Sequence, residues 1–536
     1  MKKLFAILLA LAMIFALSAT AFAEEYNLDI ANAEGREFNG YRVLDLTTSL
    51  KTGDHHPEHE GDHAPDCYNY AYTVNPTYRA ILQEEVFNNG GNYLWEESVK
   101  PATAAGITDA QIMQYLANQK SDNGDVYHTM RQVADRVYRA ILAAGIPADE
   151  TGLANQDNIG QGYWFLADVT DLDGYDANSL VIVATKGQEL LEANPKLALP
   201  TVEKKVKDIE DSEDENIADN AWHDSADHDF GDTVPFKLTA TLPSNAQYYT
   251  SYKLVFHDQM SAGLALNAGS IKVYMYDTAY KASVDTDLND YAKDVTDAFV
   301  ITTEGLDDDC TFEVGCDNIY AIEGVTKDTA FVVSYDATLT EAAVIGAAGN
   351  PNEVYLEFSN DPYSDGTGET EKDKVVVFTY QMIINKVDSH GHALKGAGFK
   401  LYKKNLAGEY ILLGDELKGD DMTTFTWTGL DDGDYKLEES TVPEGYNKMS
   451  DIVFSISAVH TANGEEPVLE SLDGGVMGTG VVDTGAITKD IVNNTGTILP
   501  ETGAQGTFLL IAGGTVLVVL AAVFMITRKK MSIYED

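Results

Sequence analysis

The sequence predicts a mainly β protein, in which tandem β-sandwich domains follow an α+β N-terminal domain and precede a single C-terminal transmembrane helix. Three observations support this prediction. Residues 199–496 consist largely of short stretches in which apolar and polar residues alternate between turn residues. Residues 24–198 mix such stretches with others at helical spacing. Residues 508–526 are apolar or small throughout.

Both ends of the chain predict export. Residues 1–23 carry two lysines, an apolar stretch and a terminal Ala-Phe-Ala, which is the pattern of a signal peptide with its cleavage site. Residues 508–526, about 19 in number, are just enough for a helix to cross a bilayer core. The tail, residues 527–536, has three basic residues near its start, Arg528, Lys529 and Lys530. The positive-inside rule therefore places this tail in the cytoplasm.

The exported part is long enough for about three domains. In residues 24–198, one stretch has the spacing of a helix face, formed by Met130, Val133, Val137 and Ile141. In residues 199–380, stretches such as "VPFKLTATL" alternate and predict the strands of a β-sandwich. Residues 381–496 predict a smaller all-β domain, with strands such as "MIINKVD" and "GDYKLEES".

The charge of the chain restricts its partners. It carries 86 acidic residues against 36 lysines and arginines, a formal net charge of -50. This excludes nucleic acid as a partner and disfavours an anionic membrane surface. The sequence holds no phosphate-binding glycine loop, Gly-x-Ser-x-Gly elbow or zinc-type Cys/His spacing. It therefore predicts neither an ordinary enzyme nor a cofactor.

Cysteine and histidine usage adds little chemistry. Three cysteines are too few for a disulfide framework on 536 residues. Cys310 and Cys316 flank "TFEVG" and either close one small hairpin disulfide or stay free thiols, and Cys67 is then unpaired. Transition-metal binding is conceivable at four histidines that stand among acids, His55, His56, His59 and His63. A polar surface loop is the simpler interpretation, so no metal ligands are assigned.

In each β domain, three polar residues share a strand face with apolar ones. Because apolar residues of alternating parity face the core, the polar residues of the same parity are expected there too. These residues are Lys204, Asp258 and Asn360 in the first β domain, and Lys386, Glu439 and Asn493 in the second. Lys205 is the alternative lysine in the first domain, but Lys204 shares its strand face with Val202 and is therefore preferred. Asn494 is the alternative asparagine in the second domain, but Asn493 shares its face with Ile491 and is therefore preferred.

Burial of these groups would favour amide-bond chemistry. An isolated buried charge is costly, so the pKa of such a group shifts until the neutral form prevails. A neutral lysine is a nucleophile, and a protonated acid beside it can polarise an asparagine carboxamide and relay protons as ammonia leaves. The product is a Lys–Asn isopeptide bond formed without an enzyme, with Asp258 and Glu439 as catalytic acids. The alternative is that these side chains reach solvent at the strand ends.

The C-terminal region carries a specific resemblance. The motif Leu499-Pro500-Glu501-Thr502-Gly503, the apolar stretch and the basic tail together resemble the cell-wall sorting signal of Gram-positive surface proteins. In that family, a sortase cysteine attacks the threonine carbonyl, here that of Thr502, and releases everything from Gly503 onward. The resemblance implies a membrane-held precursor that ends on the cell wall and surface of a Gram-positive bacterium, with sortase and peptidoglycan as partners.

Further stretches resemble pilins. "YKLEESTVPEGY" is similar to the E-box of CnaB-type pilin domains, with Glu439 in its catalytic position, and "VNNTGTILPETG" follows it. "PTVEKKVKD", "GDTVPFKLTATLP", "HDQMSAGL" and "YLEFSNDP" resemble the isopeptide-forming middle domain of major backbone pilins of the SpaA-like group. The resemblance covers most of residues 165–505. It implies Ig-like/CnaB-type β-sandwiches and self-catalysed isopeptide bonds.

The same resemblance implies a polymer. In such pilins, a lysine of the next subunit accepts the acyl group, and "EANPKLALPTVEKK" keeps the Pro-Lys core of that acceptor motif at Lys196. Lys186 is the second choice. The implied function is the shaft subunit of a covalent homopolymer, joined between Thr502 and this lysine. A singly displayed, wall-anchored adhesin is the alternative. Tip and base pilins and a host or bacterial surface ligand remain open as further partners.

Overall fold

The computed structural model divides the chain into two compact units. Unit 1 comprises residues 1–209, 219–379 and 460–470, and unit 2 comprises residues 210–218, 380–459 and 471–536. The structure describes residues 26–28, 30, 33–51, 68–92, 94, 100–119, 129–172, 174, 176–186, 198–209, 222–285, 287–288, 290–464, 466–495, 511, 514–518, 520–521 and 523.

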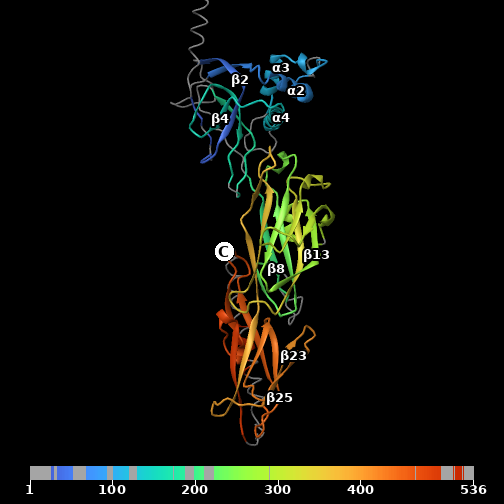
Figure 1. Ribbon diagram of the computed structural model, residues 1–536, viewed down its shortest axis with the longest axis vertical. Helices are drawn as coiled ribbons and strands as arrows, with labels where there is room; N and C mark the ends of the chain where they lie inside the picture. Colours follow the sequence, from blue (N-terminus) through green and yellow to red (C-terminus); the bar gives the residue numbers. More distant parts are fainter. Residues whose placement is uncertain are drawn as a thin grey trace, which may run out of the picture. The chain divides into compact units, whose positions relative to one another are not determined.

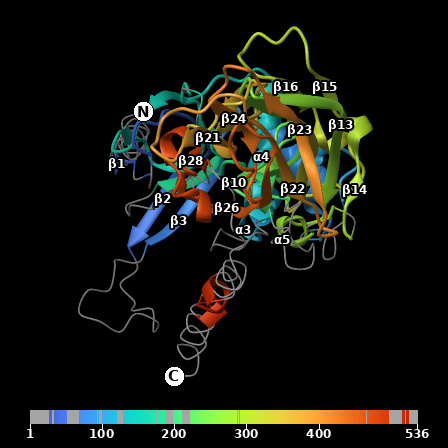
Figure 2. The ribbon, with the colours of Figure 1, turned by 90° about the horizontal axis from the view of Figure 1, so that it is seen from below.

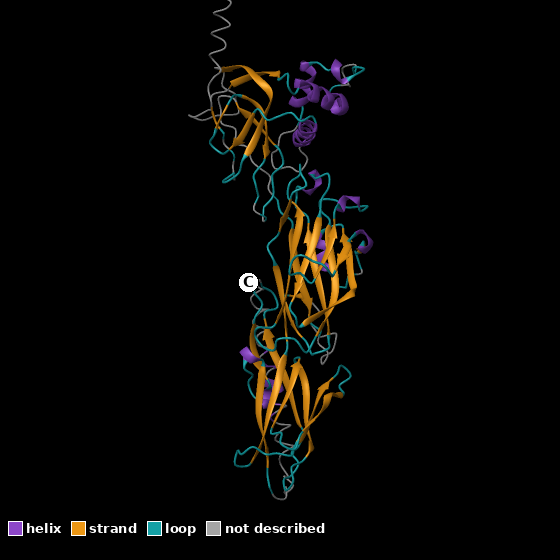
Figure 3. Ribbon diagram, viewed as in Figure 1, coloured by secondary structure: helices purple, strands orange, loops and turns teal. Residues whose placement is uncertain are grey.

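The first part of unit 1 combines a sheet with helices, which are drawn in purple in Figure 3. Its larger sheet has the order β3-β2-β6-β7, with β4 paired to β2, and β1 pairs with β5. Figure 2 shows β2 and β3 side by side. The elements are β1 (Tyr26–Asn27), β2 (Phe38–Lys51), β3 (Tyr68–Val74), α2 (Arg79–Asn89), α3 (Asp109–Ala117), α4 (Thr129–Ala143), β4 (Glu150–Leu153), β5 (Asn158–Ile159), β6 (Gly162–Asp168) and β7 (Ile182–Lys186).

The helices follow from the local sequence. Helix α3 begins with a capping box, in which Thr108 and Gln111 satisfy each other's backbone N–H groups. The residues at helical spacing in α4 are all buried, and they pack in one core with residues of the sheet such as Tyr41 and Phe165.

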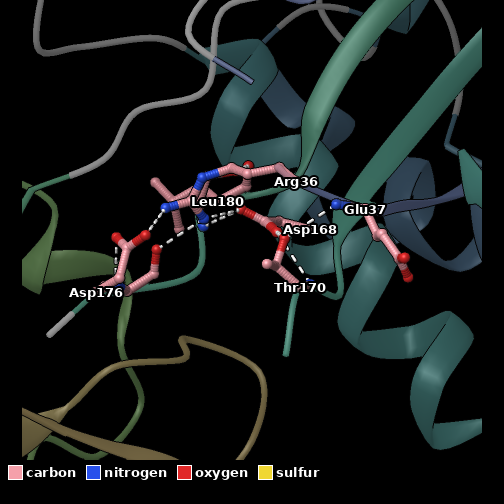
Figure 4. A network of polar contacts seen from close by, with 8 residues as sticks. Arg36, Glu37, Asp168, Thr170, Asp176 and Leu180 are labelled. Carbon is pink, nitrogen blue, oxygen red and sulfur yellow. Dashed lines mark hydrogen bonds and ion pairs between the residues drawn. The ribbon is translucent and has the colours of Figure 1, made fainter. Parts of the chain in front are cut away.

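A buried ion network fixes a loop of this part (Figure 4). Arg36 Nη1 lies 2.7 Å from Asp168 Oδ2, and Arg36 Nη2 lies 2.5 Å from Asp176 Oδ2. Asp168 also accepts hydrogen bonds from the hydroxyl of Thr170 at 2.6 Å and the backbone N–H of Ser179 at 2.9 Å. The side chain of Arg36 is 6% exposed and that of Asp168 is fully buried, so each charge depends on the other.

The second part of unit 1 is a β-sandwich. Its two sheets have the orders β10-β20-β18-β12-β16-β15, with β19 paired to β18, and β14-β13-β17-β11-β8-β9. Alternate residues of the long strands fill one core between the sheets, for example Phe236, Phe256 and Leu356. The elements are β8 (Thr201–Lys207), β9 (Trp222–His223), β10 (Ser225–Asp227), β11 (Thr233–Thr241), β12 (Leu254–Met260), β13 (Leu264–Tyr276), α5 (Ala279–Val284), β14 (Lys293–Asp294), β15 (Val300–Thr302), β16 (Phe312–Cys316), β17 (Ala330–Leu339), β18 (Asn350–Ser359), β19 (Thr367–Glu369) and β20 (Asp373–Phe378).

Unit 2 contains two further sheets, with the orders β24-β21-β28 and β23-β22-β25-β26-β27. Its first strand and its last strand, β21 and β28, are parallel neighbours. Figure 1 labels β23 and β25. The strands are β21 (Tyr380–Asp388), β22 (Gly398–Lys404), β23 (Tyr410–Lys418), β24 (Thr424–Leu430), β25 (Gly433–Thr441), β26 (Ile452–His460), β27 (Leu469–Asp473) and β28 (Ala486–Asn493). The described chain is thus mainly β, as predicted.

Several predicted features lie outside the described residues. These are the signal peptide, the histidine-rich stretch with Cys67, the acceptor Lys196, the Leu499–Gly503 motif and the cytoplasmic tail. Only scattered positions of residues 508–526 are described. Among the described residues, no helix has both the length and the apolar character needed to span a membrane. These features stay predictions.

Of the two alternatives for Cys310 and Cys316, a hairpin disulfide or free thiols, the structure has the free thiols. The stretch between them does not turn back on itself. Phe312–Cys316 form a single strand, β16, which pairs with β12. The extended strand from Phe312 to Cys316 spans roughly 13 Å, which carries Cys316 away from Cys310.

Candidate functional site

The core of the sandwich in unit 1 contains a polar cluster that spans its two sheets. Cluster 1 consists of Lys204, Asp258, Tyr335 and Asn352, each at most 1% exposed. Lys204 lies on β8, labelled in Figure 1, and Tyr335 on β17 of the same sheet. Asp258 on β12 and Asn352 on β18 come from the facing sheet. Strand alternation turns all four side chains inward, as part of buried faces that are largely apolar.

The four side chains form a closed set of hydrogen bonds. Lys204 Nζ donates to Asn352 Oδ1 at 2.6 Å, to the Tyr335 hydroxyl at 3.0 Å and to Asp258 Oδ2. The Tyr335 hydroxyl donates to Asp258 Oδ2 and accepts from Asn352 Nδ2, both at 2.8 Å. The amine of Lys204 therefore lies directly against the carboxamide of Asn352.

Burial controls the protonation of cluster 1. It lowers the pKa of the Lys204 ammonium and raises the pKa of the Asp258 carboxyl, because a charge without water is costly. The attraction between the two groups opposes both pKa shifts but does not reverse them. Burial also raises the pKa of the Tyr335 phenol. The shifts at Lys204 and Asp258 bring their two pKa values closer together, which eases proton transfer from the ammonium to the carboxylate and so the formation of a nucleophilic neutral amine.

The asparagine differs from the predicted one. Asn360 lies eight residues from Asn352, about 26 Å along an extended strand, and is therefore out of reach of Lys204. The backbone N–H of Asn360 instead donates to the carbonyl of Gly366, and its carbonyl accepts from the backbone N–H of Asn178. Both asparagines have the parity of the buried apolar residues of β18, so parity could not separate them. The pairing register of β18 with β12 separates them, because it places Asn352 opposite Met260, two residues beyond Asp258.

Unit 2 buries a second cluster. Cluster 2 consists of Lys386, Glu439 and Asn493, again at most 1% exposed. Lys386 is opposite Ile491 in the parallel pairing of β21 with β28, and Asn493 follows two residues later on the same face. Glu439 comes from β25 in the other sheet. The amine and the carboxamide are thus on neighbouring strands, with the acid facing them.

The contacts in cluster 2 differ from those in cluster 1. Glu439 Oε1 accepts a hydrogen bond from Asn493 Nδ2 at 2.7 Å, and Glu439 Oε2 accepts one from the backbone of Met449 at 2.8 Å. Lys386 Nζ donates to the carbonyl of Ile491 at 3.0 Å. Burial lowers the pKa of Lys386 to about 8, against a smaller opposing effect of the Glu439 charge. A substantial share of this amine is neutral near pH 8.

The competing residues point elsewhere. Lys205 Nζ lies 2.5 Å from Asp224 Oδ1 and 3.2 Å from Glu203 Oε1, on the opposite side of the strand from Lys204. Asn494 is exposed, whereas Asn493 is buried. Of the two acceptor candidates, only Lys186 is described, as the last residue of β7, opposite Gly162.

A separate charged group surrounds His257 in unit 1. Its Nδ1 lies 3.0 Å from Asp308 Oδ2 and 3.3 Å from Glu313 Oε1. Burial lowers the pKa of His257, but hydrogen bonds to Glu357 and Asp308 outweigh this effect and raise the pKa overall. Donor atoms of His257, Asp308 and Cys310 lie within 4.8 Å of one another. The imidazolium itself balances the carboxylates, and we assign no metal here.

Fold and site together define the class of the protein: tandem β-sandwiches, each of which buries a lysine, an acid and an asparagine in its core. Residues 380–466 match the family described as "SpaA: Prealbumin-like fold domain". The "Trypsin-resistant surface T6 protein" of Streptococcus pyogenes serotype M6 is 26% identical over 267 residues, which is 47% of this chain and 44% of that protein. The chain is thus similar to this surface protein over part of its length, and residues 380–466 are similar to SpaA-type domains.

Solved structures of backbone pilins are similar at low sequence identity. The T6 backbone pilin of serotype M6 Streptococcus pyogenes has a TM-score of 0.48 and 17% identity, covering 88% of this chain and 99% of that one. The full-length major pilin RrgB from Streptococcus pneumoniae has a TM-score of 0.38 and 13% identity, covering 65% and 86%. The aligned region of the T6 surface protein is less than half of that protein's length.

Proposed function

We propose that this chain is the structural shaft subunit of a covalently polymerised, cell-wall-anchored pilus whose β domains are sealed by Lys–Asn isopeptide bonds. The observation that carries the proposal is the burial of a lysine amine with an asparagine carboxamide and an acid in both β-sandwich domains. The likeness to pilins of the SpaA group and the Leu499–Gly503 motif support it.

In cluster 1, the reaction starts from Lys204 Nζ, which is held 2.6 Å from Asn352 Oδ1 and hence beside the carboxamide carbon. The amine attacks Cγ of Asn352, a new C–N bond forms, the Cγ–Nδ2 bond breaks and ammonia leaves. The amine loses one proton and the departing nitrogen gains one, with Asp258 as the group that carries it. Holding the groups together in a dry core removes the entropy cost of their encounter.

In cluster 2, Lys386 and Asn493 react in the same way. Glu439 is placed differently from Asp258, because it contacts the nitrogen that leaves as ammonia. It can deliver the proton to that nitrogen directly.

The two bonds would protect the subunit against pulling. Tension that enters at an acceptor lysine before β8 and leaves at Thr502 would cross from Lys204 to Asn352, follow the chain to Lys386 and cross to Asn493. Each covalent link then takes most of one sandwich out of the force path. This is the property that a shaft subunit requires, since every subunit of the fibre carries the whole load.

Sortase would join the subunits by transferring the Thr502 acyl group to Lys196 of the next subunit, with Lys186 as the second candidate. The finished fibre would be attached to peptidoglycan on the cell surface. A singly displayed adhesin would share the wall attachment and both cross-links, but it would need no acceptor lysine.

Blotting of the cell-wall fraction separates the two functions. We expect a ladder of very large, SDS-resistant species, whereas a single band would indicate the adhesin. Thr502→Ala should remove both the ladder and wall attachment. Lys196→Ala should remove the ladder and leave an anchored monomer, with Lys186→Ala as the matched control that keeps the ladder. A ladder that survives both lysine variants would refute the proposed joint.

A further inference from the structure

Tyr335 occupies an unusual position in cluster 1, because its hydroxyl contacts all three groups of the proposed reaction. It lies 3.0 Å from the attacking nitrogen of Lys204, 2.8 Å from Asp258 Oδ2 and 2.8 Å from Nδ2 of Asn352, the nitrogen that leaves. We infer that Tyr335 is a catalytic proton relay, which passes a proton from Asp258 to the leaving nitrogen of Asn352. This inference rests on the isopeptide bond of the proposed function.

The need for a relay follows from the position of the acid. Asp258 Oδ2 contacts the amine and the phenol, and among the described hydrogen bonds none joins Asp258 to Asn352. In cluster 2, by contrast, Glu439 contacts Nδ2 of Asn493 directly at 2.7 Å. The two clusters thus present the same reactants with different proton paths, one through a hydroxyl and one direct.

The relay has a defined sequence of steps. A planar carboxamide nitrogen shares its lone pair with the carbonyl and accepts no proton. Once Nζ of Lys204 has added to Cγ of Asn352, Nδ2 becomes tetrahedral and basic. Tyr335 then turns its O–H toward Nδ2 and gives up this proton, while its oxygen takes the carboxyl proton of Asp258. The Cγ–Nδ2 bond breaks, ammonia leaves, and the proton released by the Lys204 nitrogen restores Asp258. Tyr335 and Asp258 end unchanged.

The ring of Tyr335 is held independently of its hydroxyl. It stacks on Phe236 with a centroid distance of 5.3 Å and meets Phe312 edge-on at 4.8 Å. A phenylalanine at this position keeps both ring contacts and loses only the oxygen. Tyr335→Phe is therefore a specific test of the relay.

The experiment follows the full chain, made by cell-free synthesis and sampled over time, by intact mass and by mapping of the cross-linked peptides. In the wild type we expect the loss of two molecules of ammonia. In Tyr335→Phe we expect the Lys204–Asn352 bond to form about 100-fold more slowly or not at all, the usual scale of a lost acid–base group. The Lys386–Asn493 bond should form at its wild-type rate and serve as the internal control.

A matched variant separates chemistry from packing. Tyr252→Phe removes another fully buried hydroxyl from the same core without touching cluster 1, and it should leave both rates unchanged. A wild-type rate of the Lys204–Asn352 bond in Tyr335→Phe would overturn the relay while leaving the isopeptide proposal intact. A wild type that loses no ammonia would instead overturn the isopeptide proposal itself.

A second measurement covers the case in which Tyr335→Phe does not fold. Replacement of all tyrosines by 3-fluorotyrosine makes the phenol more acidic with little change in size. The rate of the Lys204–Asn352 bond should then change, whereas that of the Lys386–Asn493 bond should not. Unchanged rates at both bonds would contradict the relay.

Discussion

Replacement of Asn352 by alanine should abolish the cross-link of unit 1, and replacement of Asn360 should not. Asn352 contributes the carboxamide that lies 2.6 Å from Lys204 Nζ, whereas Asn360 lies past the end of β18. In intact mass, Asn352→Ala should therefore be one ammonia heavier than expected for a fully cross-linked protein of its sequence. Asn360→Ala should show the full loss of two.

The stability change can be worked from the separation of the linked residues. Lys204 and Asn352 are 148 positions apart. With disulfide loop closure as a guide, a link across a loop of this length stabilises the fold by about 5 kcal/mol. For a domain of this size, that corresponds to a decrease of roughly 10–20 °C in Tm when the link is absent. Differential scanning calorimetry should show this decrease in Asn352→Ala, mainly in the transition of unit 1.

The two variants control for each other, since both remove a buried asparagine from the same region. The assignment would be refuted by an Asn360→Ala protein that regains one ammonia, or by an Asn352→Ala protein that still loses two. If Asn352→Ala regains one ammonia but keeps the wild-type Tm, the Lys204–Asn352 bond stands and its role in stability is rejected.

Three further predictions concern other groups. Glu439→Gln keeps the shape of the side chain but carries no transferable carboxyl proton, so intact mass should regain one ammonia from unit 2. In Asn493→Ala, Lys386 stays an amine with a folded pKa of about 8, below its unfolded value of about 10.4. The unfolded state then binds more protons between these two values, so the free energy of unfolding, measured in urea, should rise with pH across this window and stay flat in K386M/N493A. Arg36→Ala strands the buried carboxylate of Asp168 and should destabilise the first part of unit 1 by about 3–5 kcal/mol, seen as faster proteolysis.

Much of the candidate site could be predicted because strand parity is a strict physical rule. A shift of one residue turns a side chain to the other face of a sheet. The apolar neighbours therefore distinguished Lys204 from Lys205, and Asn493 from the exposed Asn494. The burial of Lys204 and Asn493 can therefore be predicted without knowing which strands are neighbours.

The remaining features depend on register and pairing, which parity does not contain. Asn352 and Asn360 share one parity, and only the pairing of β18 with β12 brings Asn352 near Asp258. Tyr335 reads as one more core aromatic in the apolar alternation of β17. Its contact with cluster 1 appears only when the two sheets face each other.

The identity of the asparagine also determines which part of a pulled subunit stays under load in the proposed fibre. A link from Lys204 to Asn352 takes residues 205–351 out of the force path, and a link from Lys386 to Asn493 takes out residues 387–492. Between the two links, residues 353–385 remain in the path, about 33 residues that would span at most about 110–120 Å if fully extended. With Asn360 as the partner, the rest of β18 would carry no load.

With Asn352 as the partner, β18 receives the tension directly at the cross-link. This strand is paired on one side with β12 and on the other with β20, and its buried faces hold Val354, Leu356 and Phe358 in the core. Residues 353–385 are held further by the pairing of β18 with β19, of β20 with β10, and of β21 with β24 and β28. The mechanical strength of the subunit should therefore depend on the central position of β18 in its sheet as well as on the two covalent bonds.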